Sequence, residues 1–301
     1  MAFLEVRDMR KNFGGTEVLK GVSFSLEKGK VLAVIGSSGN GKTTLLRCLN
    51  GLEEADGGSV TVDGVTANYG ATTEENAVNG GKKTKKKKRA AENGAEAENR
   101  DFTLVFQNFQ LFPQYTAKRN VSLAADLSEL RALKNEKLPS KEKSALKKQI
   151  REKNDENARR LLEKVGLAEK CAAYPCELSG GMLQRVMTAC VLILRPDVIL
   201  ADEPTSALDV VNVRAVLASL QEVRRTTGSA LVLVTHDLGL AAGLADRFVI
   251  LMSGGIVEKG GREIFERPSH PYTQRLALAW RRANAVLQES LAAGPAPAAE
   301  E

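Results

Sequence analysis

The octapeptide Gly-Ser-Ser-Gly-Asn-Gly-Lys-Thr at positions 36–43 lies between two segments of different character. Before it comes the unbroken apolar run 31–35, which is typical of a strand buried on both faces of a parallel sheet. After it comes the segment 44–49, whose composition favours a helix. A strand, a glycine-rich loop and a helix in this order predict one βα unit. Further apolar runs alternate with helical segments along the chain, and this alternation predicts the α/β class.

The loop has the spacing G-x-x-x-x-G-K-[ST], which predicts a phosphate-binding function. Glycines let backbone N–H groups turn inward around phosphates, and the helix N-terminus adds a partial positive charge. In such a loop the lysine reaches the β/γ-phosphates and the Thr hydroxyl ligates Mg²⁺. The alternative is a glycine-rich turn that binds no ligand. The predicted nucleotide-binding residues are Gly36, Ser37, Ser38, Gly39, Asn40, Gly41, Lys42, Thr43 and Thr44.

A second apolar run, 198–201, ends in the acidic pair Asp202 and Glu203. An acid at the carboxyl end of a buried parallel strand lies at the edge of the sheet where ligands bind. Asp202 suits the coordination shell of Mg²⁺, and Glu203 suits the base or polariser of an attacking water. The alternative is an acidic strand end that is simply solvated.

A third apolar run, 231–235, is followed by His236, one of only two histidines in the chain. A single histidine is more often structural than catalytic. This one follows a buried strand at the place where a sensor of the γ-phosphate would lie, so we favour a catalytic role for His236.

The segment Leu-Ser-Gly-Gly-Met at 178–182 lies about twenty residues before the acidic pair. With the motifs above, it makes residues 3–265 resemble the ATP-binding subunit of ABC transporters. The family's signature sequence usually ends in Gln, and Met182 departs from it, although some peptide-importer ATPases also carry Met there. The resemblance implies that Ser179, Gly180 and Gly181 bind the γ-phosphate of ATP held by an opposite subunit.

The same resemblance assigns roles to three further segments. Gln107 is similar to the glutamine that contacts Mg²⁺ and water, and 206–209 resembles the D-loop. Phe13 lies where the family places an aromatic ring on adenine. The alternative for Phe13 is a partly exposed aromatic residue on a strand. The cofactors implied are ATP and Mg²⁺.

The resemblance implies a P-loop NTPase core with an antiparallel β subdomain and a helical lobe that carries the signature motif. We expect one ABC ATPase domain over 1–301. Its expected parts are the core with its β subdomain (3–107 and 186–265), an insert (68–101), the helical lobe (108–185) and a C-terminal extension (266–301).

The net charge of +6 is unevenly distributed. Residues 131–160 hold eleven Lys or Arg against five Asp or Glu, and the insert 68–101 holds eight against six. The composition of the insert predicts a flexible loop. Its basic run 82–89 leaves open a patch that touches anionic lipid, or a nuclear-import signal. The four cysteines lack C-x-x-C spacing, so we expect reduced, mostly buried thiols in a cytosolic protein.

No segment reaches the roughly eighteen apolar residues of a membrane span, and the N-terminus lacks a signal-peptide core. We therefore expect a peripheral protein at the cytoplasmic face of the membrane. The resemblance implies three partners: a transmembrane permease, a second ATPase subunit in a homodimer, and a solute-binding protein if the transporter is an importer.

Two sets of residues indicate different transporter subgroups. Residues 109–123 resemble the stretch of polar amino-acid importer ATPases that faces the permease, whereas Met182 and 267–273 resemble peptide-importer ATPases. We rank import of polar amino acids first and peptide import second. ABC ATPases outside transport act on nucleic acid or the ribosome, but only the basic insert supports that alternative, and we expect no nucleic-acid partner.

Overall fold

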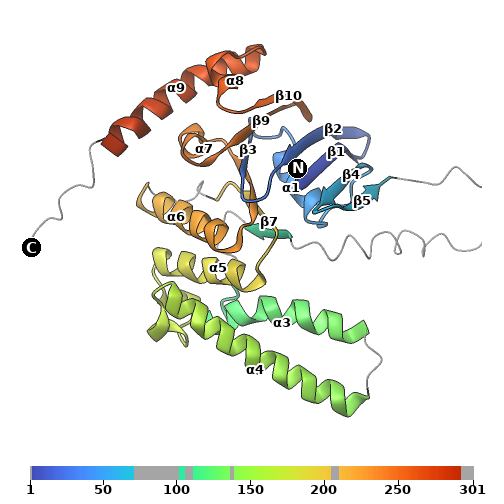
Figure 1. The fold of residues 1–301 in the computed structure, drawn as a ribbon, viewed down its shortest axis with the longest axis vertical. Coiled ribbons are helices and arrows are strands. Elements are labelled where there is room, and N and C mark those ends of the chain that lie inside the picture. Colours follow the sequence, from blue (N-terminus) through green and yellow to red (C-terminus); the bar gives the residue numbers. More distant parts are fainter. Residues whose placement is uncertain (1, 71–101, 106–110, 136–138, 205–209, 293–301) are drawn as a thin grey trace, which may run out of the picture. The chain divides into compact units, whose positions relative to one another are not determined.

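The computed structural model describes residues 2–70, 102–105, 111–135, 139–204 and 210–292, shown as coloured ribbon in Figure 1. The chain forms two compact units, and we describe each by itself. The first comprises Met1–Leu104, Leu200–Glu203 and Ala230–Glu301, and the second comprises Val105–Ile199 and Pro204–Ser229. The helical unit therefore takes in more of the chain than the range 108–185 expected from the sequence.

The first unit is built on a sheet with strand order β10-β9-β3-β8-β7-β6, and the boundary with the second unit falls within β6 and within β7. Strand β3 pairs in parallel with both β8 and β9, and every residue of β3 and β8 is buried. This burial explains why both strands are continuous apolar runs in the sequence. The strands are β3 (Val31–Ile35), β6 (Phe102–Val105), β7 (Val198–Asp202), β8 (Ala230–Thr235), β9 (Arg247–Met252) and β10 (Gly255–Gly260).

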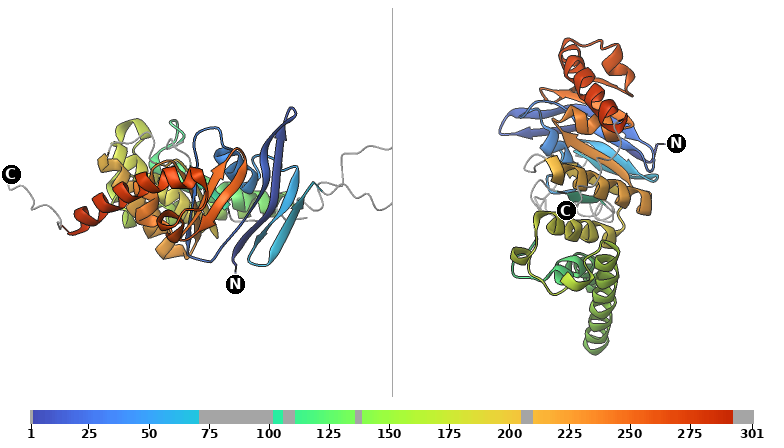
Figure 2. Two further views of the ribbon diagram at one scale, coloured as in Figure 1. Left: turned by 90° about the horizontal axis from the view of Figure 1, so that it is seen from above. Right: turned by 90° about the vertical axis from the view of Figure 1, so that its left-hand side faces the viewer.

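A second, antiparallel sheet of the first unit has the strand order β2-β1-β4-β5. It lies beside the six-stranded sheet, and β2 contacts β10, which pairs antiparallel with β9 (Figure 2). Its strands are β1 (Leu4–Phe13), β2 (Thr16–Leu26), β4 (Gly57–Val62) and β5 (Val65–Tyr69). In β1 and β2, buried residues recur between exposed ones because one face of the sheet is packed and the other is solvated.

The start of the insert, expected at residue 68, is corrected by strand β5. Asn68 and Tyr69 pair with Ser59 and Gly58 of β4. The two strands are joined by a tight turn in which Asp63 and Gly64 both have positive φ. The sequence shows this turn clearly, but β5 has only one fully buried residue and so lacks a strong apolar pattern. Residues 71–101, with the basic run, lie outside the described residues.

The described residues of the first unit also form the helices α1 (Lys42–Leu49), α7 (Leu238–Leu244), α8 (Glu263–Glu266) and α9 (Pro271–Ala292). The C-terminal helix α9 is fixed to the sheet by an aromatic cluster. The ring of Trp280 stacks on Phe265 with centroids 4.1 Å apart, and both rings meet Phe248 of β9 edge-on. The expected C-terminal extension therefore packs against the first unit at Trp280, which is buried.

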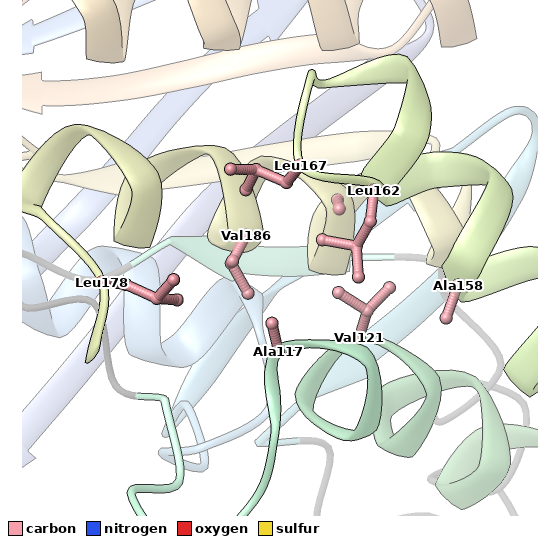
Figure 3. Close-up of a cluster of buried hydrophobic side chains, with 8 residues drawn as sticks. Ala117, Val121, Ala158, Leu162, Leu167, Leu178 and Val186 are labelled. Carbon is pink, nitrogen blue, oxygen red and sulfur yellow. The ribbon is translucent and has the colours of Figure 1, made fainter. Parts of the chain in front are cut away.

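The second unit is helical. Its helices are α3 (Ala117–Asn135), α4 (Ser140–Lys164), α5 (Gly180–Leu194) and α6 (Val210–Thr227), with short 3-10 turns at Ala168–Lys170 and Pro175–Glu177. Helix α4 lies along α3 (Figures 1 and 2). Figure 3 shows Val121 of α3, Leu162 of α4 and Val186 of α5 pointing into one apolar cluster, and all three are fully buried. This cluster packs α3, α4 and α5 against one another.

A buried polar group fixes how α3 and α4 pair. Asp126 is only 1% exposed, and its carboxylate accepts hydrogen bonds from Arg119 at 2.6 Å and from Asn154 of α4 at 3.1 Å. Removing either donor would leave a buried charge with less compensation, so these contacts favour one register of the two helices.

Among the helices that the structure describes, none has both the length and the apolar character needed to cross a bilayer.

The cysteines are all free, as expected, but only Cys48 is buried, and Cys176 is exposed. Burial raises the pKa of the Cys48 thiol to about 11. Because the thiolate is the reactive form, Cys48 should stay unlabelled by iodoacetamide at about pH 8, whereas Cys176 reacts. Mass spectrometry of the native protein and of a Cys176→Ser control would measure this. Equal labelling of Cys48 and Cys176 in the folded protein would contradict the assigned burial.

Candidate active site

The glycine-rich loop joins β3 to α1, and its shape depends on close packing against neighbouring backbone. A Cβ atom on Gly36 would clash with the carbonyl oxygen of Leu251 in β9. Gly41 has a φ of 90°, and a Cβ there would lie 2.9 Å from the carbonyl oxygen of Val18 in β2. Both positions therefore need glycine for steric reasons, and the loop is held between the two sheets of the first unit.

Asn40 holds the loop against the β9–β10 hairpin. Its side-chain amide donates to the carbonyl of Leu251 at 3.2 Å and to Ser37 Oγ at 3.1 Å, and its Oδ1 accepts from Ser253 N at 3.1 Å. We predicted Asn40 as a nucleotide-binding residue. The structure shows that its side chain fixes the loop, and the nucleotide-binding role of Asn40 stays a prediction.

Lys42 lies at the start of α1 and is only 5% exposed. Its ammonium donates to the carbonyl oxygens of Gly36 at 2.9 Å and Ser37 at 3.0 Å. It also lies 3.8 Å from a carboxylate oxygen of Glu203. These contacts hold a desolvated positive charge inside the loop, where it can attract phosphate strongly.

Thr43 and Asp202 come together although they are far apart in the sequence. The Thr43 hydroxyl donates to a carboxylate oxygen of Asp202 at 3.3 Å. Burial raises the pKa of Asp202, and the hydrogen bond from Thr43 partly opposes this shift. The two residues present hard oxygen ligands side by side. Mg²⁺ is typically bound by one or two such protein oxygens together with phosphate oxygens and water, so this pair fits a magnesium site.

Glu203 connects the lysine with the histidine. One carboxylate oxygen lies 3.8 Å from Lys42 Nζ, and the other lies 3.3 Å from His236 Nδ1. The backbone N–H of Glu203 donates to the Val234 carbonyl in β8 at 2.9 Å. His236 is 63% exposed at its side chain, which leaves its ring able to meet a ligand.

Glu203 has a φ of 44°, in the left-handed region. This conformation costs a non-glycine residue about 1–2 kcal/mol. The next residue is Pro204, and a following proline further restricts the φ and ψ angles that Glu203 can adopt. Such strain persists only where the surroundings impose it, and it gathers at functional sites. The sequence motif indicates the carboxylate but not this backbone conformation.

Phe13 ends β1, and its side chain is 45% exposed. The Lys11 ammonium lies 4.8 Å from the ring centroid, so one side of the ring already interacts with a cation. Both the adenine-stacking role and the plain surface aromatic remain compatible with this position, and the adenine role stays a prediction.

Ser179, Gly180 and Gly181 belong to the second unit and lie at the N-terminus of α5. Ser179 is the N-cap residue, and its Oγ accepts from Met182 N at 3.4 Å. Ser179 and Gly180 are exposed, so the helix start offers backbone N–H groups and its partial positive charge to an anion. Gln107 and the D-loop segment 206–209 lie outside the described residues, and their roles stay predictions.

Comparison with known proteins gives the family of the chain. Residues 19–206 match the model of a family described as ABC transporter. The chain belongs to the ABC transporter family. The expected P-loop fold, with its antiparallel β subdomain and helical lobe, is thereby confirmed. Two solved structures are similar over most of this ABC protein. The ATP-binding subunit of an ABC transporter is 26% identical with a TM-score of 0.62, and the match covers 88% of this chain and 92% of that one. A dimeric ATP-binding cassette in a post-hydrolysis state, bound to ADP and Pi, is 25% identical with a TM-score of 0.60, and the match covers 86% of this chain and 98% of that one.

Two curated relatives narrow the comparison within the ABC family. The arginine transport ATP-binding protein ArtM of Bacillus subtilis is 38% identical over 272 residues, which cover 90% of this chain and 97% of ArtM. The methionine import ATP-binding protein MetN of Rhizobium johnstonii is 37% identical over 259 residues. That match covers 85% of this chain but only 60% of MetN, so the chain spans about three fifths of that relative.

Proposed function

We propose that this ABC protein binds ATP with Mg²⁺ and hydrolyses it. One observation carries the proposal: the first unit gathers Lys42, Thr43, Asp202, Glu203 and His236 around one glycine-rich loop, through the contacts described above. Each side chain suits a different part of phosphoryl transfer to water. The ABC family to which the chain belongs, and the related cassette bound to ADP and Pi, support the same activity.

The residues take the following roles. Lys42 and the loop N–H groups bind the β- and γ-phosphates, and Thr43 and Asp202 hold Mg²⁺. The ion supplies neutralisation of the charge on the phosphates. Glu203 accepts a hydrogen bond from the attacking water and polarises it. His236, oriented by Glu203, contacts the γ-phosphate and so distinguishes ATP from ADP.

A second copy of the chain completes this site. Ser179, Gly180 and Gly181 at the start of α5 bind the γ-phosphate of ATP that is held by the other subunit. The exposed helix N-terminus and the dimeric arrangement of the related cassette support this arrangement. The γ-phosphate then bridges two subunits, and its loss on hydrolysis releases them.

We further propose that the chain is the motor of an importer of polar amino acids. The name of ArtM, which states arginine transport, supports a polar amino acid as the solute, and the name of MetN, which states methionine import, supports amino-acid import as the broader class. The transporter requires a transmembrane permease and a solute-binding protein, and the ATPase lies peripherally at the cytoplasmic face of the membrane. Phe112, 49% exposed, and the adjacent ring of Tyr115 provide an aromatic contact for the permease. Peptide import is the alternative, because His270 and Tyr272 lie in a segment that resembles peptide-importer ATPases.

Affinity purification from solubilised membranes of the native cells tests the proposed partner. We expect the tagged chain to recover an integral membrane permease. Proteoliposomes made from that complex should take up methionine or arginine with ATP, and the complex with Lys42→Ala should not. Uptake of peptides alone would select the alternative substrate. Recovery of ribosomes or DNA without a permease would contradict the transport function.

A further inference from the structure

The segment between α8 and α9 reaches the glycine-rich loop. The hydroxyl of Tyr272 accepts a hydrogen bond from Ser37 N at 3.0 Å and lies 3.2 Å from Ser37 Oγ. The two residues are 235 positions apart in the sequence, and both belong to the first unit. None of the roles assigned above to the nucleotide site involves Tyr272.

The bond acts on a peptide that also contacts Lys42. The N–H of the Gly36–Ser37 peptide donates to Tyr272, and the carbonyl of that same peptide accepts from Lys42 Nζ at 2.9 Å. A peptide unit is planar and rigid, so its N–H and its carbonyl turn together. Tyr272 therefore fixes, from one side, the orientation of the carbonyl that holds the lysine ammonium on the other side.

The tyrosine is itself held in place from β10. The carboxylate of Glu258 accepts from Ser269 N and Ser269 Oγ, both at 3.0 Å, and from His270 N at 3.2 Å. His270 Nδ1 then accepts from Tyr272 N at 3.1 Å. Burial acts to raise the pKa of Glu258, but the hydrogen bonds from Ser269 and His270 outweigh it and keep this pKa below its ordinary value. Glu258 thus stays charged at neutral pH and keeps the turn in one conformation.

We propose that Tyr272 is a positioning residue for ATP binding, which acts through the Gly36–Ser37 peptide on Lys42. This inference rests on the proposed nucleotide site. In this proposal the segment 268–272, which is not part of the glycine-rich loop, sets the affinity of that loop for ATP. This role requires no contact between Tyr272 and the nucleotide.

The variant Tyr272→Phe tests the proposal because it removes only the hydroxyl. The ring stays, and with it the contact to the Arg275 guanidinium, 5.8 Å from the ring centroid. We expect the dissociation constant for ATP to rise about three- to tenfold, the scale of one lost net hydrogen bond. The kcat at saturating ATP should change by less than about twofold, since the groups that act on water are untouched. Tyr69→Phe in β5 is the matched control, with unchanged affinity.

A double-mutant cycle separates this role from a structural one. If Tyr272 acts through Lys42, then Tyr272→Phe costs no further affinity in a Lys42→Ala background. An equal loss in both backgrounds, or an unchanged dissociation constant in Tyr272→Phe alone, would overturn the proposal. So would a fall in the nucleotide-free melting temperature with no change in affinity. If Lys42→Ala alone binds ATP like the wild type, the nucleotide site itself is misassigned, which is a different failure.

Discussion

Replacing Glu203 with Gln is expected to lower kcat for ATP hydrolysis by at least about a hundredfold while ATP still binds. Glutamine keeps the size of the side chain but loses the negative charge that polarises water. The same change removes the negative charge that lies 3.8 Å from Lys42 Nζ, so the lysine ammonium interacts with the phosphates without competition from the Glu203 carboxylate. The dissociation constant for ATP should therefore stay the same or fall.

Single-turnover and steady-state hydrolysis, with a separate ATP titration, measure the two effects of Glu203→Gln. Glu266→Gln, an exposed position on α8, is the matched control and should hydrolyse ATP like the wild type. A Glu203→Gln protein with turnover within a few fold of wild type would refute the role of this carboxylate. Loss of ATP binding in the variant would instead show that Glu203 is needed to shape the loop.

Lys42→Ala is expected to weaken ATP binding itself by about ten- to a hundredfold, the scale of a charge-assisted hydrogen bond to phosphate. The ammonium is a compact charge that is almost fully buried, and alanine can replace neither its charge nor its bonds to Gly36 and Ser37.

Titration with a fluorescent ATP analogue and Mg²⁺ measures the affinity of Lys42→Ala. Lys30→Ala is the control, because it removes an equal charge from a half-exposed surface ion pair with Asp246 on the same unit. Unchanged affinity in Lys42→Ala would mean that residues 36–43 form only a turn. A comparable loss in Lys30→Ala would mean that net charge, and not the position of Lys42, determines binding.

Much of the fold could be predicted because its signals are local. The runs that became β3 and β8 are apolar at every position, and burial on both faces leaves no other composition for them. The position of Asp202 and Glu203 could also be predicted, because they follow an apolar run and the carboxyl ends of parallel strands lie at one edge of the sheet. The glycine-rich loop could be identified from the spacing of its glycines. Gly36 and Gly41 must be glycine because a Cβ atom at either position would lie too close to neighbouring backbone.

The rest depends on contacts between distant parts of the chain, which local patterns do not encode. The bond from Asn40 to Leu251 spans 211 positions, and the bond from Ser37 to Tyr272 spans 235. The left-handed backbone of Glu203 likewise arises from its surroundings, since nothing in its own residue type favours it. The residues 267–273 resemble a segment of peptide-importer ATPases, but only the structure shows that this segment contacts the glycine-rich loop.

A mixing experiment tests most directly whether two subunits share each ATP site. Lys42→Ala damages the loop of one subunit, and Ser179→Arg damages the start of α5 in the other. In a mixed head-to-tail dimer, one shared site carries both changes and the other carries neither. We expect each variant alone to be inactive and ATP hydrolysis to return when the two are mixed. A mixture as inactive as its components, or a single Ser179→Arg variant with full activity, would contradict the shared site.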